Sequence, residues 1–257
     1  CDQEMARLVS ILKEILSANP NTPAQLAEIA LQLVAEYARS TGAAAQHVDQ
    51  LIYIQITRGV AMRDHVMPDN LTPTVFVMTN LMKPPPESQR RQGVACVTAD
   101  DFRWQKAHIK STSLLGAVFA RQISFDVGAI ETVMFRDGYL SEAAACNVWV
   151  VKNGQLLGTP KDNLVLEGIR YGLIEEICQT RGIPFELRRI SRAEVEAADE
   201  LLLSSATKEV LPVTQLDGHP VGNGKPGPVY AALYAGYQEA KAAVLAAAST
   251  DTAHAAP

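Results

Sequence analysis

The chain has 257 residues, 47% of them hydrophobic, and a formal net charge of -5. This length is enough for one large or two ordinary domains, and the apolar content can fill a sizeable core. Because no dense run of Lys or Arg interrupts the acidic balance, and no stretch of about 18 apolar residues could span a bilayer, we expect neither a nucleic-acid nor a membrane partner. A small-molecule ligand is the better expectation.

The four cysteines are widely spaced and include no CxxC pair, so the sequence predicts neither a zinc site nor a redox pair. Scattered thiols are typical of a cytoplasmic protein, which is the location we expect. The histidines show no metal-ligand spacing either, and no metal is expected. The chain opens at Cys1 and runs directly into helical sequence, which suggests that an N-terminal segment is missing.

The first section of the chain changes from helical to strand patterns. Apolar residues recur at three- and four-residue steps over 4–16, and again over 22–39. Thr22-Pro23 is typical of an N-cap followed by proline in the first turn. Two helices are therefore predicted. A two-residue alternation then predicts strands at 50–57 and 74–78.

A run of prolines marks the expected domain boundary. Three consecutive prolines follow Lys83, and they exclude both a helix and a central strand. We therefore expect an interdomain linker at 84–87, between a small N-terminal α/β domain of residues 1–83, which is incomplete, and a larger C-terminal domain of residues 88–257.

The second section predicts a mixed arrangement in which strands come before most of the helices, so that the whole chain has an α/β (α+β) fold in two domains. Two hairpins are expected at Asp137-Gly138 and Asn153-Gly154. The other expected elements are a strand at 93–97, helices at 113–122, 168–181 and 229–247, a buried strand at 200–204, and a disordered tail of the last ten residues.

Lys110 is a candidate for covalent chemistry. Lysine can form a Schiff base when burial or a neighbouring cation lowers its pKa. Lys110 stands where an apolar segment meets a hydroxyl-rich helix start, within residues 104–116. A lysine at a helix start more often lies in solvent, so the local pattern leaves a catalytic and a solvated lysine both open.

Several segments resemble those of a known family. Residues 109–122 (IKSTSLLGAVFARQ) resemble the cofactor-lysine segment of the D-amino-acid transaminases, which are fold-type IV enzymes dependent on pyridoxal phosphate. Residues 139–149 (YLSEAAACNVW) resemble that family's glutamate motif, and 163–169 (NLVLEGI) its phosphate-binding turn. Segments 53–59 and 63–65 match in the same order, so the resemblance covers nearly the whole chain.

The resemblance implies a homodimeric enzyme that binds pyridoxal 5'-phosphate and exchanges amino groups between a D-amino acid, such as D-alanine, and a 2-oxo acid. Lys110 is implied to hold the cofactor through a Schiff base and to move a proton, and Glu142 to keep the pyridine nitrogen protonated. A surface carboxylate at a hairpin end is the alternative interpretation of Glu142. The other implied cofactor contacts are Arg7, Asn147, Leu166, Gly168, Ile169, Arg170, Ser205, Ala206 and Thr207.

The implied substrate pocket uses Arg63 and His65 to bind the α-carboxylate, with Tyr53 lining it. Arginine suits this task because its planar fork bonds a carboxylate bidentately. A polar loop is the alternative interpretation of the Arg-x-His pair, and a solvated helix arginine that of Arg7. Aminodeoxychorismate lyase, branched-chain aminotransferase and a homologue that binds the cofactor without catalysis are the alternative functions.

Four departures from the family pattern favour the last of these alternatives. Arg170 and Ala206 stand where threonines are usual, and residues 144–146 (AAC) stand where serines are usual. The family's first strands, which carry a pocket tyrosine, lie upstream of this sequence. We expect Arg170 either to supply charge to the phosphate or to fill its site.

Overall fold

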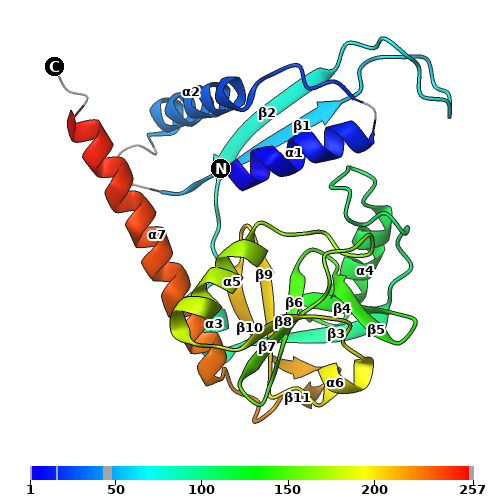
Figure 1. Cartoon of the computed structure of the whole chain (residues 1–257), viewed down its shortest axis with the longest axis vertical. Coiled ribbons are helices and arrows are strands. Elements are labelled where there is room, and N and C mark those ends of the chain that lie inside the picture. Colours follow the sequence, from blue (N-terminus) through cyan, green and yellow to red (C-terminus); the bar gives the residue numbers. More distant parts are fainter. Residues whose placement is uncertain (1, 16, 43–47, 255–257) are drawn as a thin grey trace. The chain divides into compact units, whose positions relative to one another are not determined.

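The computed structural model describes residues 2–15, 17–42 and 48–254. The chain divides into two compact units, Cys1–Pro84 and Pro85–Pro257, whose boundary lies inside the run of prolines (Figure 1). Proline lacks an amide hydrogen and clashes with helical neighbours, so the run continues neither a strand ladder nor a helix. Within the described residues, no helix is both long and apolar enough to cross a lipid bilayer.

The first unit combines two helices with a two-stranded antiparallel sheet, which confirms the elements predicted for this section. The second helix begins at a reciprocal capping box, because Thr22 Oγ1 accepts from Gln25 N and Gln25 Oε1 accepts from Thr22 N. This helix packs on the second strand. The elements are α1 (Asp2–Glu14), α2 (Pro23–Thr41), β1 (Gln50–Thr57) and β2 (Thr74–Leu81).

The second unit contains a nine-stranded mixed sheet. Its strands are β3 (Val94–Asp100), β4 (Glu131–Arg136), β5 (Tyr139–Ala143), β6 (Asn147–Lys152), β7 (Gln155–Gly158), β8 (Phe185–Leu187), β9 (Glu200–Ser205), β10 (Glu209–Leu216) and β11 (His219–Pro220). Its helices are α3 (Glu87–Gln92), α4 (Leu115–Asp126), α5 (Arg170–Arg181), α6 (Arg192–Glu196) and α7 (Pro228–His254).

The sheet curls on itself. Its strand order is β5-β4-β3-β10-β9-β6-β7-β8, with β11 paired to β10, and β3 runs parallel to both of its neighbours. Ala143 N donates to Cys146 O, which brings β5, at one end of this order, to the start of β6. The two hairpins expected from the sequence are β4-β5 and β6-β7.

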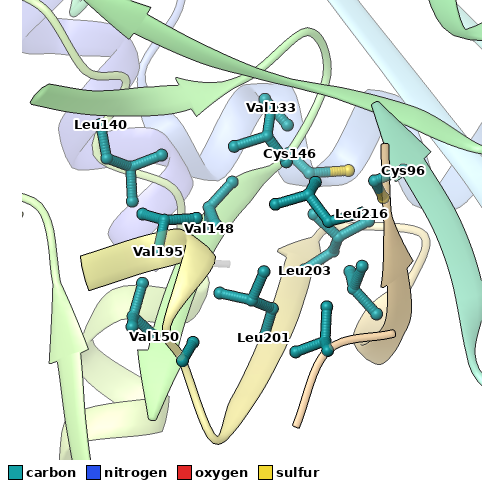
Figure 2. Close-up of a cluster of buried hydrophobic side chains, with 14 of the residues drawn as sticks. Cys96, Val133, Leu140, Cys146, Val148, Val150, Val195, Leu201, Leu203 and Leu216 are labelled. Carbon is teal, nitrogen blue, oxygen red and sulfur yellow. The ribbon is translucent and has the colours of Figure 1, made fainter. Parts of the chain in front are cut away.

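Both faces of the central strands are buried. In β6, Val148 and Val150 belong to one apolar cluster, while Trp149 and Val151 belong to another, as the alternation of side chains along a strand requires. Figure 2 shows the first cluster, in which side chains from β3, β4, β5, β6, β9 and β10 converge. The second cluster packs β6 and β9 against α5 and α7. This burial holds the residues at the start of β6 in place.

Several features of the second unit differ from the sequence-based expectation, and α3, α6, β8, β10 and β11 were not predicted. α4 begins at Leu115, two residues after the predicted start, and Lys110 lies in the coil before it. In β10, Pro212 pairs with β9 but precedes the pairing with β3, which begins at Val213. α7 continues through residues 248–254, where disorder was expected, and 255–257 lie outside the described residues.

Candidate active site

Lys110 is carried by the coil that joins β3 to α4. Ala107 N donates to Asn163 O at 2.9 Å, and Asn163 Nδ2 donates to Gln105 O at 2.7 Å, so this coil is tied to the one that precedes α5. Ala107 and Ile109 are buried, which anchors the backbone immediately before Lys110. The Lys110 side chain is exposed, and a ligand can reach it.

Glu142 lies on β5 with a side chain that is only 7% exposed, so it is not a surface carboxylate. Its Oε1 accepts from Arg103 Nη1 at 2.6 Å, and its Oε2 accepts from Asn147 Nδ2 and Leu166 N, both at 3.2 Å. Burial raises the pKa of Glu142 to about 7, and the Arg103 guanidinium opposes this rise. The carboxylate is thus held from three directions and titrates near neutrality.

Arg103, which the sequence analysis did not single out, is itself held in place. Its Nε and Nη2 donate to the two oxygens of Asp101, each at 2.9 Å. Arg136 Nη2 lies 3.2 Å from Asp101 Oδ1 and donates to Arg103 O at 2.7 Å. These contacts leave Arg103 Nη1 directed at Glu142. The sequence alone does not identify this pair, because Asp101 and Arg103 are two opposite charges two residues apart in a coil, and such a spacing has no helical or strand periodicity.

Three of the implied cofactor contacts gather around Glu142. Besides its bond to Glu142, Asn147 Nδ2 donates to Leu166 O at 2.9 Å. A Cβ on Gly168 would lie 2.2 Å from Asn147 Oδ1, so only glycine fits at that position. The coil before α5 therefore passes close to the amide of Asn147, and residues from β5, β6 and this coil meet at one point.

The other implied cofactor contacts of the second unit lie where α5 begins and β9 ends. Arg170 Nη2 donates to Ala206 O at 3.1 Å, and the guanidinium lies over the Tyr237 ring, 5.0 Å from its centroid. Among the described residues, Arg170 Nε is buried without a hydrogen-bond partner. A helix start with an unsatisfied guanidinium hydrogen is suited to an anion.

The hydroxyl groups at the end of β9 have different partners, and one of them bonds to a side chain in the hydrophobic core. Ser204 Oγ accepts from Trp149 Nε1 at 2.8 Å, and both residues are fully buried. Ser205 Oγ accepts from Lys208 N at 3.1 Å, which closes the turn. Ser205 and Thr207 remain as partly exposed hydroxyls close to Arg170.

Cys146, which stands where the motif usually has a serine, belongs to a buried polar cluster. Its Sγ lies 3.4 Å from Glu131 Oε2 and 3.2 Å from Lys208 Nζ, and that Nζ lies 3.3 Å from Glu131 Oε2. Burial raises the pKa of Cys146 to about 12, so it remains a thiol at neutral pH. Position 146 therefore has a buried thiol with contacts inside the protein, where the motif usually has a hydroxyl group.

The residues implied to bind the substrate lie in the first unit, with Arg7. Tyr53, on β1, is 42% exposed, and its hydroxyl donates to a glutamine on the same strand. Arg63 and His65 are exposed on the coil between β1 and β2. Arg7, on α1, is ion-paired with a glutamate one turn earlier. The roles of these four side chains stay predictions.

The amino-transferase class IV family model matches residues 1–216. The D-alanine aminotransferase of Bacillus licheniformis is 37% identical over 72% of this chain, and the match spans 65% of that enzyme's length. The D-alanine aminotransferase of Listeria monocytogenes serotype 1/2a is 33% identical over 91% of this chain and 78% of its own.

The fold is shared with solved structures of branched-chain amino acid aminotransferases. For the Escherichia coli enzyme the TM-score is 0.80 at 22% sequence identity, and the match covers 90% of this chain and 76% of the other. For the PLP-form (holo-form) of the Thermobaculum terrenum enzyme the TM-score is 0.79 at 19% identity, over 92% of this chain and 76% of the other. This similarity identifies the two-domain fold-type IV architecture that the sequence motifs predicted.

Proposed function

The chain belongs to the amino-transferase class IV family, and from this premise we propose that it transfers amino groups between a D-amino acid, such as D-alanine, and a 2-oxo acid, with pyridoxal 5'-phosphate as cofactor. The observation that carries the proposal is a buried carboxylate, Glu142, bonded to the coil that carries Lys110. A lysine and a charged partner for the ring nitrogen are the two protein groups that this cofactor requires.

The residues present fit the cofactor at both of its polar ends. Glu142 accepts three hydrogen bonds, and since a carboxylate offers about four acceptor sites, one remains for a protonated ring nitrogen. At the other end, a phosphate would give the buried Arg170 Nε its missing partner. When bound, the cofactor supplies an aldehyde that takes up the amino group and a ring that withdraws electrons from the substrate.

In this proposal Lys110 has two tasks. Its amine would hold the cofactor at the aldehyde carbon and, when free, would carry the proton between the substrate α-carbon and the cofactor. Glu142 would accept a hydrogen bond from the ring nitrogen and keep that nitrogen protonated. Asn147 and the Leu166 amide orient Glu142. The proposed phosphate contacts are Arg7, Gly168, Ile169, Arg170, Ser205, Ala206 and Thr207.

The proposed substrate contacts are Tyr53, Arg63 and His65. Arg63 binds the α-carboxylate as a fork, His65 adds a second donor, and Tyr53 lines the pocket. All three side chains are exposed in the first unit, so they are accessible to a ligand. This Arg-x-His pair is the reason for proposing D-amino acids over the branched-chain L-substrates.

We further propose a cytoplasmic homodimer without nucleic-acid or membrane partners. An exposed apolar face on α4 supports association, because an isolated protein rarely leaves so many large apolar side chains of one helix in water. These side chains are 39% to 67% exposed and comprise Leu115, Val118, Phe119, Ile123 and Phe125. The described cysteines are free thiols, which is consistent with a reducing compartment.

The decisive experiment is a visible absorbance spectrum of the purified protein with pyridoxal 5'-phosphate, recorded before and after adding D-alanine or L-alanine. We expect a long-wavelength band from the lysine-linked cofactor, bleached by the D-isomer alone. Bleaching by branched-chain L-amino acids would instead assign the branched-chain activity. A stable band that no amino acid bleaches would indicate a binding protein without catalysis, and pyruvate release from aminodeoxychorismate would indicate the lyase.

A further inference from the structure

We propose that Arg103 is a positioning residue that favours the ionised form of Glu142 and leaves one acceptor site, on Oε1, for the cofactor ring nitrogen. This inference rests on the proposed function for the identity of the ligand. It concerns a contact, between Arg103 Nη1 and Glu142 Oε1 at 2.6 Å, that is present in the protein alone.

The orientation of the Arg103 guanidinium is fixed by its neighbours. Its bidentate bond to Asp101 occupies Nε and Nη2, and Nη2 also donates to Leu164 O at 3.4 Å. Asp101 is fully buried and also bound by Arg136, so it cannot turn away. A bidentate fork is rigid, and its remaining nitrogen, Nη1, is consequently aimed at Glu142.

Most of the acceptor sites on Glu142 are occupied by protein donors. Asn147 and the Leu166 amide both donate to Oε2, while Arg103 donates to Oε1. Since each carboxylate oxygen offers about two lone pairs, Oε2 is saturated and Oε1 retains one. Oε1 is therefore the atom that would accept a hydrogen bond from the ring nitrogen.

Burial and the charges around Glu142 act on its protonation in opposite directions. Burial disfavours the charged form of Glu142, and Asp101 adds a like charge, whereas Arg103 favours ionisation by its charge and its hydrogen bond. Tyr171 stays neutral because burial raises its pKa well above neutrality, so it adds no charge near Glu142. Arg103 is thus the cation that offsets burial, and a protonated Glu142 could not hold the ring nitrogen protonated.

The test is a pH titration of Glu142 in the full chain without cofactor. NMR of protein labelled with ¹³C at the glutamate carboxyl carbons monitors the titration, and the Glu142 resonance is assigned by its absence in Glu142→Gln. In Arg103→Met we expect the pKa of Glu142 to rise by roughly 1 to 3 pH units, the effect of losing a cation in contact. Asp101→Asn combined with Arg103→Met removes both buried charges and leaves no orphaned carboxylate. The pKa of Glu142 should still rise in this double variant, by less than in Arg103→Met, because the like charge of Asp101 is also lost.

The matched control is Arg90→Met. Arg90 and Glu209 form another buried pair in the same unit, with side chains 8% and 9% exposed, and Nη2 lies 3.0 Å from Oε2. Removing Arg90 reproduces the stability loss of a broken buried pair but should leave the Glu142 titration unchanged. A folded Arg103→Met or double variant with the wild-type Glu142 titration would overturn the proposal.

A second measurement uses the loaded enzyme. In Arg103→Met, kcat at neutral pH should fall roughly tenfold for each pH unit by which the Glu142 pKa rises, with the KM for the amino acid unchanged, because the substrate contacts remain. The acid limb of the kcat profile should move up with it. A shifted Glu142 titration in a chain without any transamination would contradict the proposed function while supporting the Arg103–Glu142 coupling.

Discussion

The two ends of the candidate site differ in how far the protein satisfies its own polar groups. Around Glu142, Arg103, Asn147 and Leu166 supply donors to a carboxylate that is 7% exposed, and Arg103 is in turn held by Asp101. Around Arg170, a buried Nε has no partner among the described residues. At one end the protein's own hydrogen bonds fix the carboxylate and leave one acceptor site, whereas the other end has a buried donor without a partner among the described residues.

This difference separates two tasks. A group that must set the protonation of a ligand works best when its environment is fixed beforehand, since no reorganisation is then needed at the moment of reaction. A group that anchors a ligand can remain unsatisfied until the ligand arrives, and its unsatisfied state adds to affinity. Substitutions at the Glu142 end should therefore change kcat, and those at the Arg170 end should change cofactor affinity.

The largest effect is expected from Lys110→Ala, which belongs to neither end. Without the amine, the proton has no carrier between the substrate and the cofactor, so kcat should fall on the order of 10⁴-fold and the long-wavelength band should disappear. Equilibrium dialysis should still detect bound cofactor, because both ends remain. Lys106→Ala, an exposed lysine on the same coil, is the control. Retained activity in Lys110→Ala would refute the assignment of this lysine.

Glu142→Gln is the next largest change. The amide keeps the shape but not the charge, so kcat should fall about 10²- to 10³-fold, the size of effect seen when one electrostatic contact to the reacting group is removed. Cofactor affinity should change far less. Steady-state kinetics beside dialysis measures both, with the exposed Glu196→Gln as control. A loss of affinity as large as the loss of kcat would break the comparison between the two ends.

Arg170→Thr tests the unsatisfied end. If the guanidinium binds the phosphate, losing a charge-assisted hydrogen bond of about 1.5 to 3 kcal/mol should weaken cofactor binding roughly 10- to 100-fold. The kcat of the saturated enzyme should stay near the wild-type value. Arg188→Thr, which removes an arginine from an exposed ion pair, is the control. Tighter binding in Arg170→Thr would show instead that this arginine fills the phosphate site.

Local sequence signals predicted the framework of the fold. The capping box at Thr22, the alternation over β1 and the glycine-containing turns of the two hairpins are encoded within a few residues, so their positions could be read directly. β10 could not be predicted in this way. Its partners, β3 and β9, decide which of its amides must bond, and Pro212 is tolerated only because of that arrangement.

The residues of the candidate site also divide into those that a sequence signal identified and one that only the structure shows. The Lys110 and Glu142 segments were identified by their resemblance to a family, whereas Arg103 carries no motif of its own. Its importance arises because β5 places Glu142 beside a coil that is 39 residues distant in sequence. Contacts between one side chain and another that is remote in the chain leave no periodic pattern, so only the structure could reveal this arginine.

The smallest effect that we predict is a pH dependence from Glu142 itself. Its pKa in the folded, cofactor-free chain is raised to about 7 by burial, above that of an unfolded glutamate, so the folded state binds more protons between these two values. The free energy of unfolding should therefore decline as pH rises through this window towards 7. The kcat of the loaded enzyme should do the opposite, because only the ionised form accepts from the ring nitrogen, and kcat should fall about tenfold one pH unit below the pKa. Thermal melting and steady-state kinetics over the same pH range measure the two trends. Glu142→Gln should flatten both, whereas Arg170→Thr should weaken cofactor binding without altering the pH dependence of kcat. Parallel trends in the wild-type protein would show that Glu142 does not control kcat.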